Sequence, residues 1–132
     1  MKRIIAMTTM IGAAAGAAGA TQLGPEQLDG LLTGHTAYIA VPPGGPGGPD
    51  GGIAPFHFGA DGSAAVQLPA GLKLVGTWRI EGEGYCVDWD NGPKNSCSLI
   101  VKEEGALRTL DASDRSPRGD IESLRPGNPE GL

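Results

Sequence analysis

The chain has few of the residues that build metal centres and large cores. Its 132 residues include only two cysteines, two histidines, two tryptophans, two tyrosines and two phenylalanines. Structural zinc sites need four closely spaced Cys or His ligands. All three methionines lie within the first ten residues, in a segment that we expect to be removed, so soft copper ligands are missing as well. We expect no metal site and no bound cofactor.

Positive charge is also scarce. Ten Lys and Arg residues stand against fifteen Asp and Glu residues, for a formal net charge of −5. Binding to phosphate backbones or to anionic lipid surfaces depends on basic side chains. The acidic balance therefore excludes nucleic acid as a partner.

The one apolar run lies at the N-terminus and is short. Lys2 and Arg3 precede an uncharged stretch from Ile4 to about Gly16, and Ala18-Gly19-Ala20 follows. A basic start, a short apolar stretch and small residues are typical of a secretory signal peptide. A retained spanning helix would need about 20 strongly apolar residues. We predict a signal peptide at 1–20, no membrane span after its cleavage, and a periplasmic or secreted location in a bacterium.

Cleavage after the signal peptide changes the composition of the protein. Removal of 20 residues leaves 112, and loss of Lys2 and Arg3 moves the net charge from −5 to −7. This length is enough for one domain. The 23 glycines and 11 prolines of the chain raise the entropy lost on folding and shorten regular elements. The core is therefore expected to be small.

Cys86 and Cys97 are predicted to form a disulfide. Two cysteines in a small exported chain form a structural bridge more often than a redox or metal pair, which would need closer spacing. A hairpin centred on Asn91-Gly92 places them directly opposite one another, close enough for a bridge. Pro93 cannot donate the hydrogen bond that closes a two-residue turn, which indicates a wider loop.

The apolar faces of the two strands beside this loop disagree. In 96–102, Leu99 and Val101 share the face of the cysteine. In 85–89, the apolar residues lie on the face opposite to the cysteine. Either both faces are covered or a bulge shifts the register, and the sequence leaves both alternatives open.

The pattern of elements predicts a mainly β fold with one short N-terminal helix. Pro25 at a first helical position, an acidic first turn, and leucines at 28, 31 and 32 indicate an amphipathic helix that Gly34 ends. Strands are predicted at 36–41, 53–58, 64–68, 73–80, 85–89, 96–102 and 106–110. Such closely spaced strands without helices between them favour an antiparallel meander that forms a small barrel or a sandwich.

Two segments are expected to stand outside this pattern. Residues 42–52 are almost entirely Pro and Gly, which favours a mobile loop. The β domain is predicted to span 21–110. The polar segment 111–132 is expected to be partly disordered, or to add one edge strand through Ile121 and Leu124.

Several short motifs share their order with a known group of proteins. They are Leu-Leu-Thr-Gly-His-Thr (31–36), Phe-Gly-Ala-Asp-Gly-Ser (58–63), Gly-Thr-Trp-Arg-Ile-Glu-Gly (76–82), Tyr-Cys-Val-Asp-Trp (85–89) with Cys97, and Pro-Gly-Asn-Pro (126–129). In these motifs the chain resembles a broad group of small exported proteobacterial proteins of unknown function. Members have a leucine-rich opening, a Gly-Thr-Trp strand and two cysteines around a Trp strand. The resemblance implies compartment and fold but no activity.

Candidate binding residues are few. His35 and His57 flank the Pro- and Gly-rich loop on neighbouring predicted strands, so we expect the loop and this rim to form a contact region. The aromatic residues Tyr38, Trp78 and Trp89 either line a ligand pocket or form the core. No nucleophile motif is present, and the acidic pairs lie in predicted turns. We expect no catalytic residues and no enzymatic activity.

The sequence therefore favours a non-enzymatic periplasmic or secreted β domain that binds a small molecule or an envelope protein. The alternative is an inhibitor of a secreted or periplasmic enzyme, which would insert a loop into its target. A small-molecule binder should contain an apolar cavity behind Trp78 and Trp89, whereas an inhibitor should have a filled core and an exposed, well-supported loop.

Overall fold

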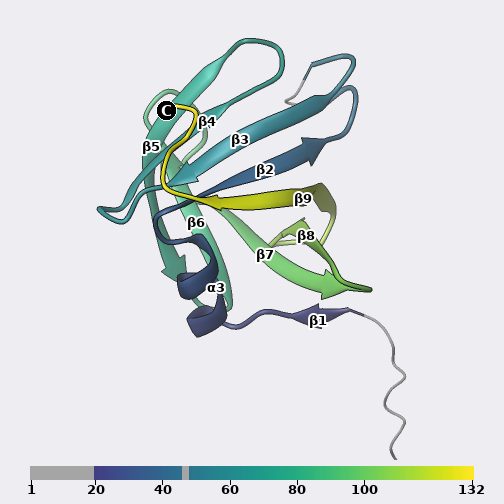
Figure 1. Ribbon diagram of the computed structural model, residues 1–132. Helices are drawn as coiled ribbons and strands as arrows, with labels where there is room; N and C mark the ends of the chain where they lie inside the picture. The colour runs from purple at the N-terminus through teal and green to yellow at the C-terminus, as the bar shows by residue number, and fades with distance from the viewer. Residues whose placement is uncertain (1–19, 46–47) are drawn as a thin grey trace, which may run out of the picture.

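The protein is an antiparallel β-barrel in a computed structural model that describes residues 20–45 and 48–132 (Figure 1). Within these residues, strands β2 to β9 pair in chain order and β9 returns to pair with β2, so eight strands close on themselves. The short strand β1 extends the sheet beside β7. The mainly β prediction is confirmed, with the barrel as the architecture. The signal peptide predicted at 1–20 lies outside the described residues except for Ala20.

The strands between 35 and 111 match the predicted segments to within one residue at each boundary. The nine strands of the described residues are β1 (Thr21–Gln22), β2 (His35–Val41), β3 (Gly52–Phe58), β4 (Ser63–Gln67), β5 (Lys73–Glu81), β6 (Gly84–Trp89), β7 (Ser96–Glu103), β8 (Ala106–Asp111) and β9 (Pro117–Pro126). Turn chemistry sets the short connections. Between β7 and β8, for example, Glu104 and Gly105 both have positive φ, at 52° and 83°, as tight hairpin turns require.

Helix α3 (Pro25–Leu32) closes one end of the barrel and packs against β2, β5 and β6 (lower left in Figure 1). The Gln27 side chain accepts a 2.8 Å hydrogen bond from the Gly24 N–H and so caps the first turn. Leu28 and Leu32 are fully buried. The predicted amphipathic helix is confirmed, and the barrel end is the surface that its leucines cover. Among the described residues, no helix is both long and apolar enough to cross a membrane.

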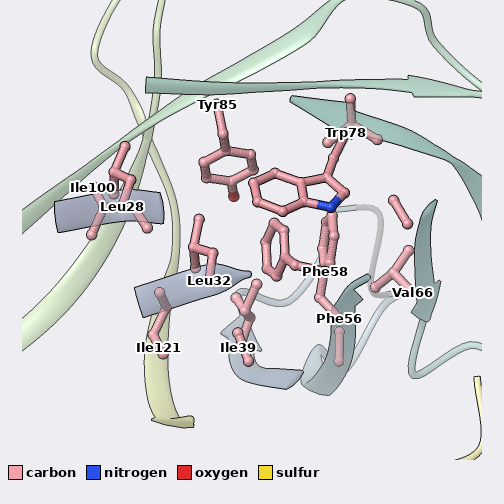
Figure 2. Close-up of a cluster of buried hydrophobic side chains, with 14 of the residues drawn as sticks. Leu28, Leu32, Ile39, Phe56, Phe58, Val66, Trp78, Tyr85, Ile100 and Ile121 are labelled. Carbon is pink, nitrogen blue, oxygen red and sulfur yellow. The ribbon is translucent and has the colours of Figure 1, made fainter. Parts of the chain in front are cut away.

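Aromatic side chains fill the half of the barrel next to the helix (Figure 2). The Phe58 ring stacks on Phe56 with centroids 4.1 Å apart, and Trp78 and Tyr85 meet it edge-on at 5.1 and 5.2 Å. Such pairs add about 0.5–1.5 kcal/mol each beyond the area they bury. The Trp78 Nε1–H donates a 2.9 Å hydrogen bond to the Gly59 carbonyl, so its polar atom is paired inside the core.

The Gly-Thr-Trp segment of β5 follows from the geometry of the barrel. A Cβ at Gly76 would collide with the backbone of Asp88 and Trp89 on β6, so the close approach of these strands requires glycine. Thr77 faces solvent and Trp78 faces the core. The motif is therefore explained by packing alone.

Strand β9 corrects the expectation for the C-terminal segment. Residues 111–132 were predicted to be partly disordered or to add an edge strand, yet β9 pairs on both sides and closes the barrel between β2 and β8. The domain therefore extends beyond 110. A register shift between β2 and β9 leaves Glu122 without a partner, so Ile121 and Leu124 pair with Ile39 and Ala37, respectively, both inward-facing residues. The bulge hides the alternation that identifies a strand.

The predicted disulfide between Cys86 and Cys97 is confirmed, and the two residues are directly opposed in the β6–β7 register. The connection between these strands spans residues 90–95, as wide as Pro93 indicated. Closing a loop of this length contributes roughly 3 kcal/mol by restricting the unfolded chain. The bridge therefore adds to the stability of a domain with a small core.

The strand faces around the bridge are now resolved. The β6–β7 pairing contains no register shift, and Tyr85 and Val87 stand opposite the inward-facing Ser98 and Ser96. The cysteines lie on the outer face. On that face Val101 is 3% exposed and lies where β1 pairs with β7. Coverage of both faces, rather than a bulge, accounts for the apolar residues.

The burial of Leu32 at the helix end of the barrel generates a stability prediction. We expect Leu32→Ala to lower the free energy of unfolding by about 2–5 kcal/mol, because it leaves a cavity in the aromatic core. Leu72→Ala is the control: Leu72 is 55% exposed, and a change of no more than about 0.5 kcal/mol is expected. Urea denaturation measures both. Equal midpoints for the two variants would contradict closure of the barrel by α3.

Candidate functional site

The end of the barrel opposite α3 holds a cavity of about 600 Å³. This volume falls within the range of about 300–1,000 Å³ that is typical of small-molecule sites. Its wall comes mainly from apolar side chains on β2 to β6 and the residues that follow them: Ile39, Val41, Ala54, Phe56, Val66, Leu68, Leu74, Tyr85, Val87 and Trp89. The cavity therefore lies between the packed aromatic core and the loops at the far end of the barrel.

Three loops and the first residue of β9 border the cavity. Pro42 and Gly45 come from the β2–β3 connection at the upper right of Figure 1, Leu68 from the β4–β5 connection and Pro93 from the β6–β7 connection, and Pro117 begins β9. In the first loop, the Gly44 N–H donates a 2.9 Å hydrogen bond to the Gly48 carbonyl. The Pro- and Gly-rich segment expected to be a contact region thus lies at the mouth of the cavity.

One wall of the cavity is polar. Arg118 enters from β9, and its Nη1 donates hydrogen bonds of 3.1 and 3.0 Å to the hydroxyl oxygens of Ser96 and Ser98. Its Nη2 lies 2.6 Å from the Asp111 carboxylate. Arg118 is the only ionised side chain among the described lining residues. The arrangement fixes the guanidinium group in the mouth through three hydrogen bonds.

A second β-bulge directs Arg118 inward. Thr109 pairs with Gly119 and Leu110 with Pro117, so Arg118 is the extra residue of β9. A bulge of this kind turns a side chain that regular alternation would place elsewhere. The Thr109 hydroxyl donates a 2.8 Å hydrogen bond to the Gly119 carbonyl and holds the bulge in place.

The electrostatics of the cluster keep its charges paired. The backbone N–H and the hydroxyl of Ser113 donate hydrogen bonds to Asp111. Together with the Arg118 guanidinium, Ser113 holds the pKa of the Asp111 carboxyl well below its usual range. Burial raises the pKa of the Tyr85 phenol, and a hydrogen bond with Ser98 acts in the opposite direction. The positive charge of Arg118 is thus balanced within the protein.

Of the aromatic residues proposed for binding, the cavity receives one. Trp89 lines it. Trp78 lies in the packed core next to Phe58. Tyr38 lies outside the cavity lining: its hydroxyl donates a 2.8 Å hydrogen bond to Glu130, and the Arg125 guanidinium carbon lies 5.5 Å from its ring centroid. The cavity was expected behind both tryptophans, but it lies behind Trp89 alone.

The two histidines lie at the wrong end of the barrel for the predicted rim. They occupy neighbouring strands, as expected, but His35 begins β2 and His57 lies near the end of β3, whereas the loop joins the opposite ends of these strands. His35 Nδ1 is 2.9 Å from the Thr33 carbonyl, and His57 Nδ1 is 3.0 Å from the Thr36 hydroxyl. The expectation that they flank residues 42–52 is therefore wrong, because an antiparallel hairpin separates its turn from its open end.

No group of three or more His, Cys, Asp or Glu residues comes together among the described residues. The cavity instead offers apolar surface with one guanidinium, two serine hydroxyls and a threonine hydroxyl.

Arg118, Ser96 and Ser98 were not predicted from the sequence as site residues. A signal existed for the serines, because they alternate with cysteine on β7 and so share the inward face with Ile100. Polar residues on an inward face indicate a wet or functional interior. No comparable signal existed for Arg118, whose direction depends on the bulge.

No protein-family model, curated protein or solved structure matches this chain. The cavity itself is therefore the basis for a functional inference.

The environment of Asp111 generates a pH prediction. A carboxyl whose pKa falls on folding stabilises the native state above its unfolded pKa, near 3.8, and this contribution is lost as the pH falls through the folded pKa. We expect the Asp111 carboxyl to stay ionised at pH values at which an ordinary aspartate is already protonated. Carbon-13 NMR of the side chain measures this directly. In the control variant Ser113→Ala the titration midpoint should rise, and a wild-type midpoint near 4 would contradict the described hydrogen bonds.

Proposed function

We propose that this protein is a non-enzymatic binding protein of the bacterial periplasm or the extracellular space that holds a small, largely apolar molecule in its barrel. The observation that carries the proposal is the cavity of about 600 Å³, bounded by apolar side chains with a few convergent polar groups. Sites with this size and composition usually bind small molecules.

The distribution of side-chain size supports a retained cavity. Phe58, Trp78 and Tyr85 fill the helix end, whereas Ala54 and Val66 line the mouth end. Protein interiors are close-packed and rarely leave space larger than a water molecule. A chain that packs aromatic rings into one end of its barrel and places small residues such as Ala54 and Val66 beside Phe56 and Trp89 at the other end leaves room for a guest.

The presence of the cavity also favours a small-molecule binder over the enzyme inhibitor. An inhibitor was expected to have a filled core beneath its loop, but the β2–β3 loop borders an open cavity. Pro42 and Gly45 at this mouth are placed to contact a molecule inside. An envelope protein that bound at the mouth would contact the outer surface of the loops. The cavity itself gives no reason to propose such a partner.

Export has three supports. The Cys86–Cys97 disulfide is compatible with an oxidising compartment. Strand β1 begins at Thr21, directly after the predicted cleavage point. The resemblance to small exported proteins points to the same compartment.

The cavity proposal predicts binding of a neutral apolar probe. We expect N-phenyl-1-naphthylamine to bind with increased fluorescence, and Val66→Phe to weaken its binding at least about tenfold, because the added ring occupies the cavity. Val75→Phe is the matched control. Val75 lies on the adjacent strand β5 and is 40% exposed, so the same substitution there should change the affinity less than about twofold.

Fluorescence titration gives both affinities, and circular dichroism melting shows whether each variant is folded. Absence of probe binding to the wild-type protein, or equal losses in two folded variants, would reject the cavity as a binding site.

The export proposal predicts processing after Ala20. When the full chain is expressed in a Gram-negative host, we expect the periplasmic fraction to contain a product that begins at Thr21 and carries the disulfide. Mass spectrometry of intact protein detects both features. A replacement of Lys2 and Arg3 by Glu should retain the unprocessed chain in the cell. A product that keeps Met1 in the wild type would contradict this assignment.

A further inference from the structure

We infer that the molecule held in the barrel carries an uncharged hydrogen-bond acceptor, such as a carbonyl or hydroxyl oxygen, that meets Arg118, and that a free carboxylate is disfavoured there. This inference rests on the proposed function and narrows its ligand class. It is carried by the position of one neutralised guanidinium on the polar wall of a largely apolar cavity.

The guanidinium group of Arg118 has more N–H donors than the surrounding protein groups accept. It carries five N–H bonds, and three of them point to Ser96, Ser98 and Asp111. No acceptor among the described residues takes the Nε–H or the second Nη2–H. The Arg118 side chain is 35% exposed and lines the cavity. A ligand oxygen can therefore complete the hydrogen bonds that the protein leaves open.

The charge balance decides what kind of oxygen fits. Asp111 lies 2.6 Å from Arg118 and stays ionised, so the pair is neutral as a unit. A second carboxylate would add an uncompensated negative charge within an apolar cavity and close to Asp111, which is costly. A carbonyl or hydroxyl oxygen accepts from the same N–H groups without this cost.

The placement of the cluster also orients the ligand. Arg118, Ser98 and Thr109 belong to β9, β7 and β8, whereas Phe56, Val66 and Leu74 belong to β3, β4 and β5. In a closed barrel of eight strands in chain order, β4 lies across from β8. One wall is therefore polar and the facing wall apolar, which suits a molecule with an apolar body and a single polar group.

A series of ten-carbon compounds tests the inference. Decan-1-ol, decan-2-one and decanoate, which is ionised at pH 7.5, share chain length and differ in the charge of the head group. Each is titrated against bound N-phenyl-1-naphthylamine. From the displacement of the probe, we expect the dissociation constants of the alcohol and the ketone for the wild-type protein to be at least about tenfold lower than that of decanoate.

Two variants separate charge from hydrogen bonding. Arg118→Met keeps the length of the side chain but removes its donors, and should weaken binding of the alcohol and the ketone about tenfold after each affinity is corrected for the affinity of the variant for the probe. Asp111→Ala leaves the guanidinium without its counter-charge, so decanoate should gain at least about tenfold relative to the alcohol. Melting curves establish that both variants are folded.

The outcomes are distinguishable from failure of the proposed function. If the probe binds but decanoate is the tightest compound, or if no compound of the series displaces it, the inference is overturned while the cavity stands as a binding site. An unchanged preference in folded Asp111→Ala overturns the charge argument and the inference with it. If the probe itself does not bind, both the proposed function and this inference fall.

Discussion

Pairing of β9 with both β2 and β8 is the constraint on which the rest of this structure depends. It converts a meander of strands into a closed barrel, and a closed barrel leaves no unpaired edge in the ring. Closure encloses an interior that a chain of this composition could not otherwise bury. The helix end, the cavity and the polar wall all take their positions from this last pairing.

Closure of the barrel is accompanied by irregular pairing of its last strand. Strand β9 contains two bulges, at Glu122 against β2 and at Arg118 against β8. The first returns Ile121 and Leu124 to the interior, and the second brings a charged side chain into the mouth. Bulges are frequent at barrel rims and beside functional sites because they redirect a side chain without ending the pairing. Closure and the polar wall thus have the same local origin.

Most of the fold was predictable because local signals agreed with one another. Closely spaced segments rich in β-forming residues marked the strands, and Pro25 and Gly34 marked the helix. The spacing of Cys86 and Cys97 placed the cysteines opposite one another, although the sequence left the register of the strands around them open. These features depend on neighbours in the chain. Agreement of such local preferences with the global fold is expected of a natural sequence.

The candidate site was not predictable in the same way. His35 and His57 flank the loop 42–52 in the sequence, but they lie at the ends of β2 and β3 that are far from this loop. The direction of Arg118 depends on the pairing of β9 with β8, whereas the polar composition of residues 111–132 had predicted at most an edge strand. Which of Trp78 and Trp89 lines the cavity depends on which end of the barrel α3 closes. Each failure concerns long-range geometry.

The disulfide has a consequence for how the proposed guest would reach the interior. It ties β6, which carries Trp89, to β7, which carries Ser96 and Ser98, and so joins two walls of the cavity covalently. These strands cannot part to admit a molecule. The proposed guest would enter and leave between the loops at the mouth, where Pro42, Pro93 and Pro117 restrict the backbone. For such a guest, opening between β6 and β7 is excluded as a route, and the width of the mouth would limit the rate of exchange.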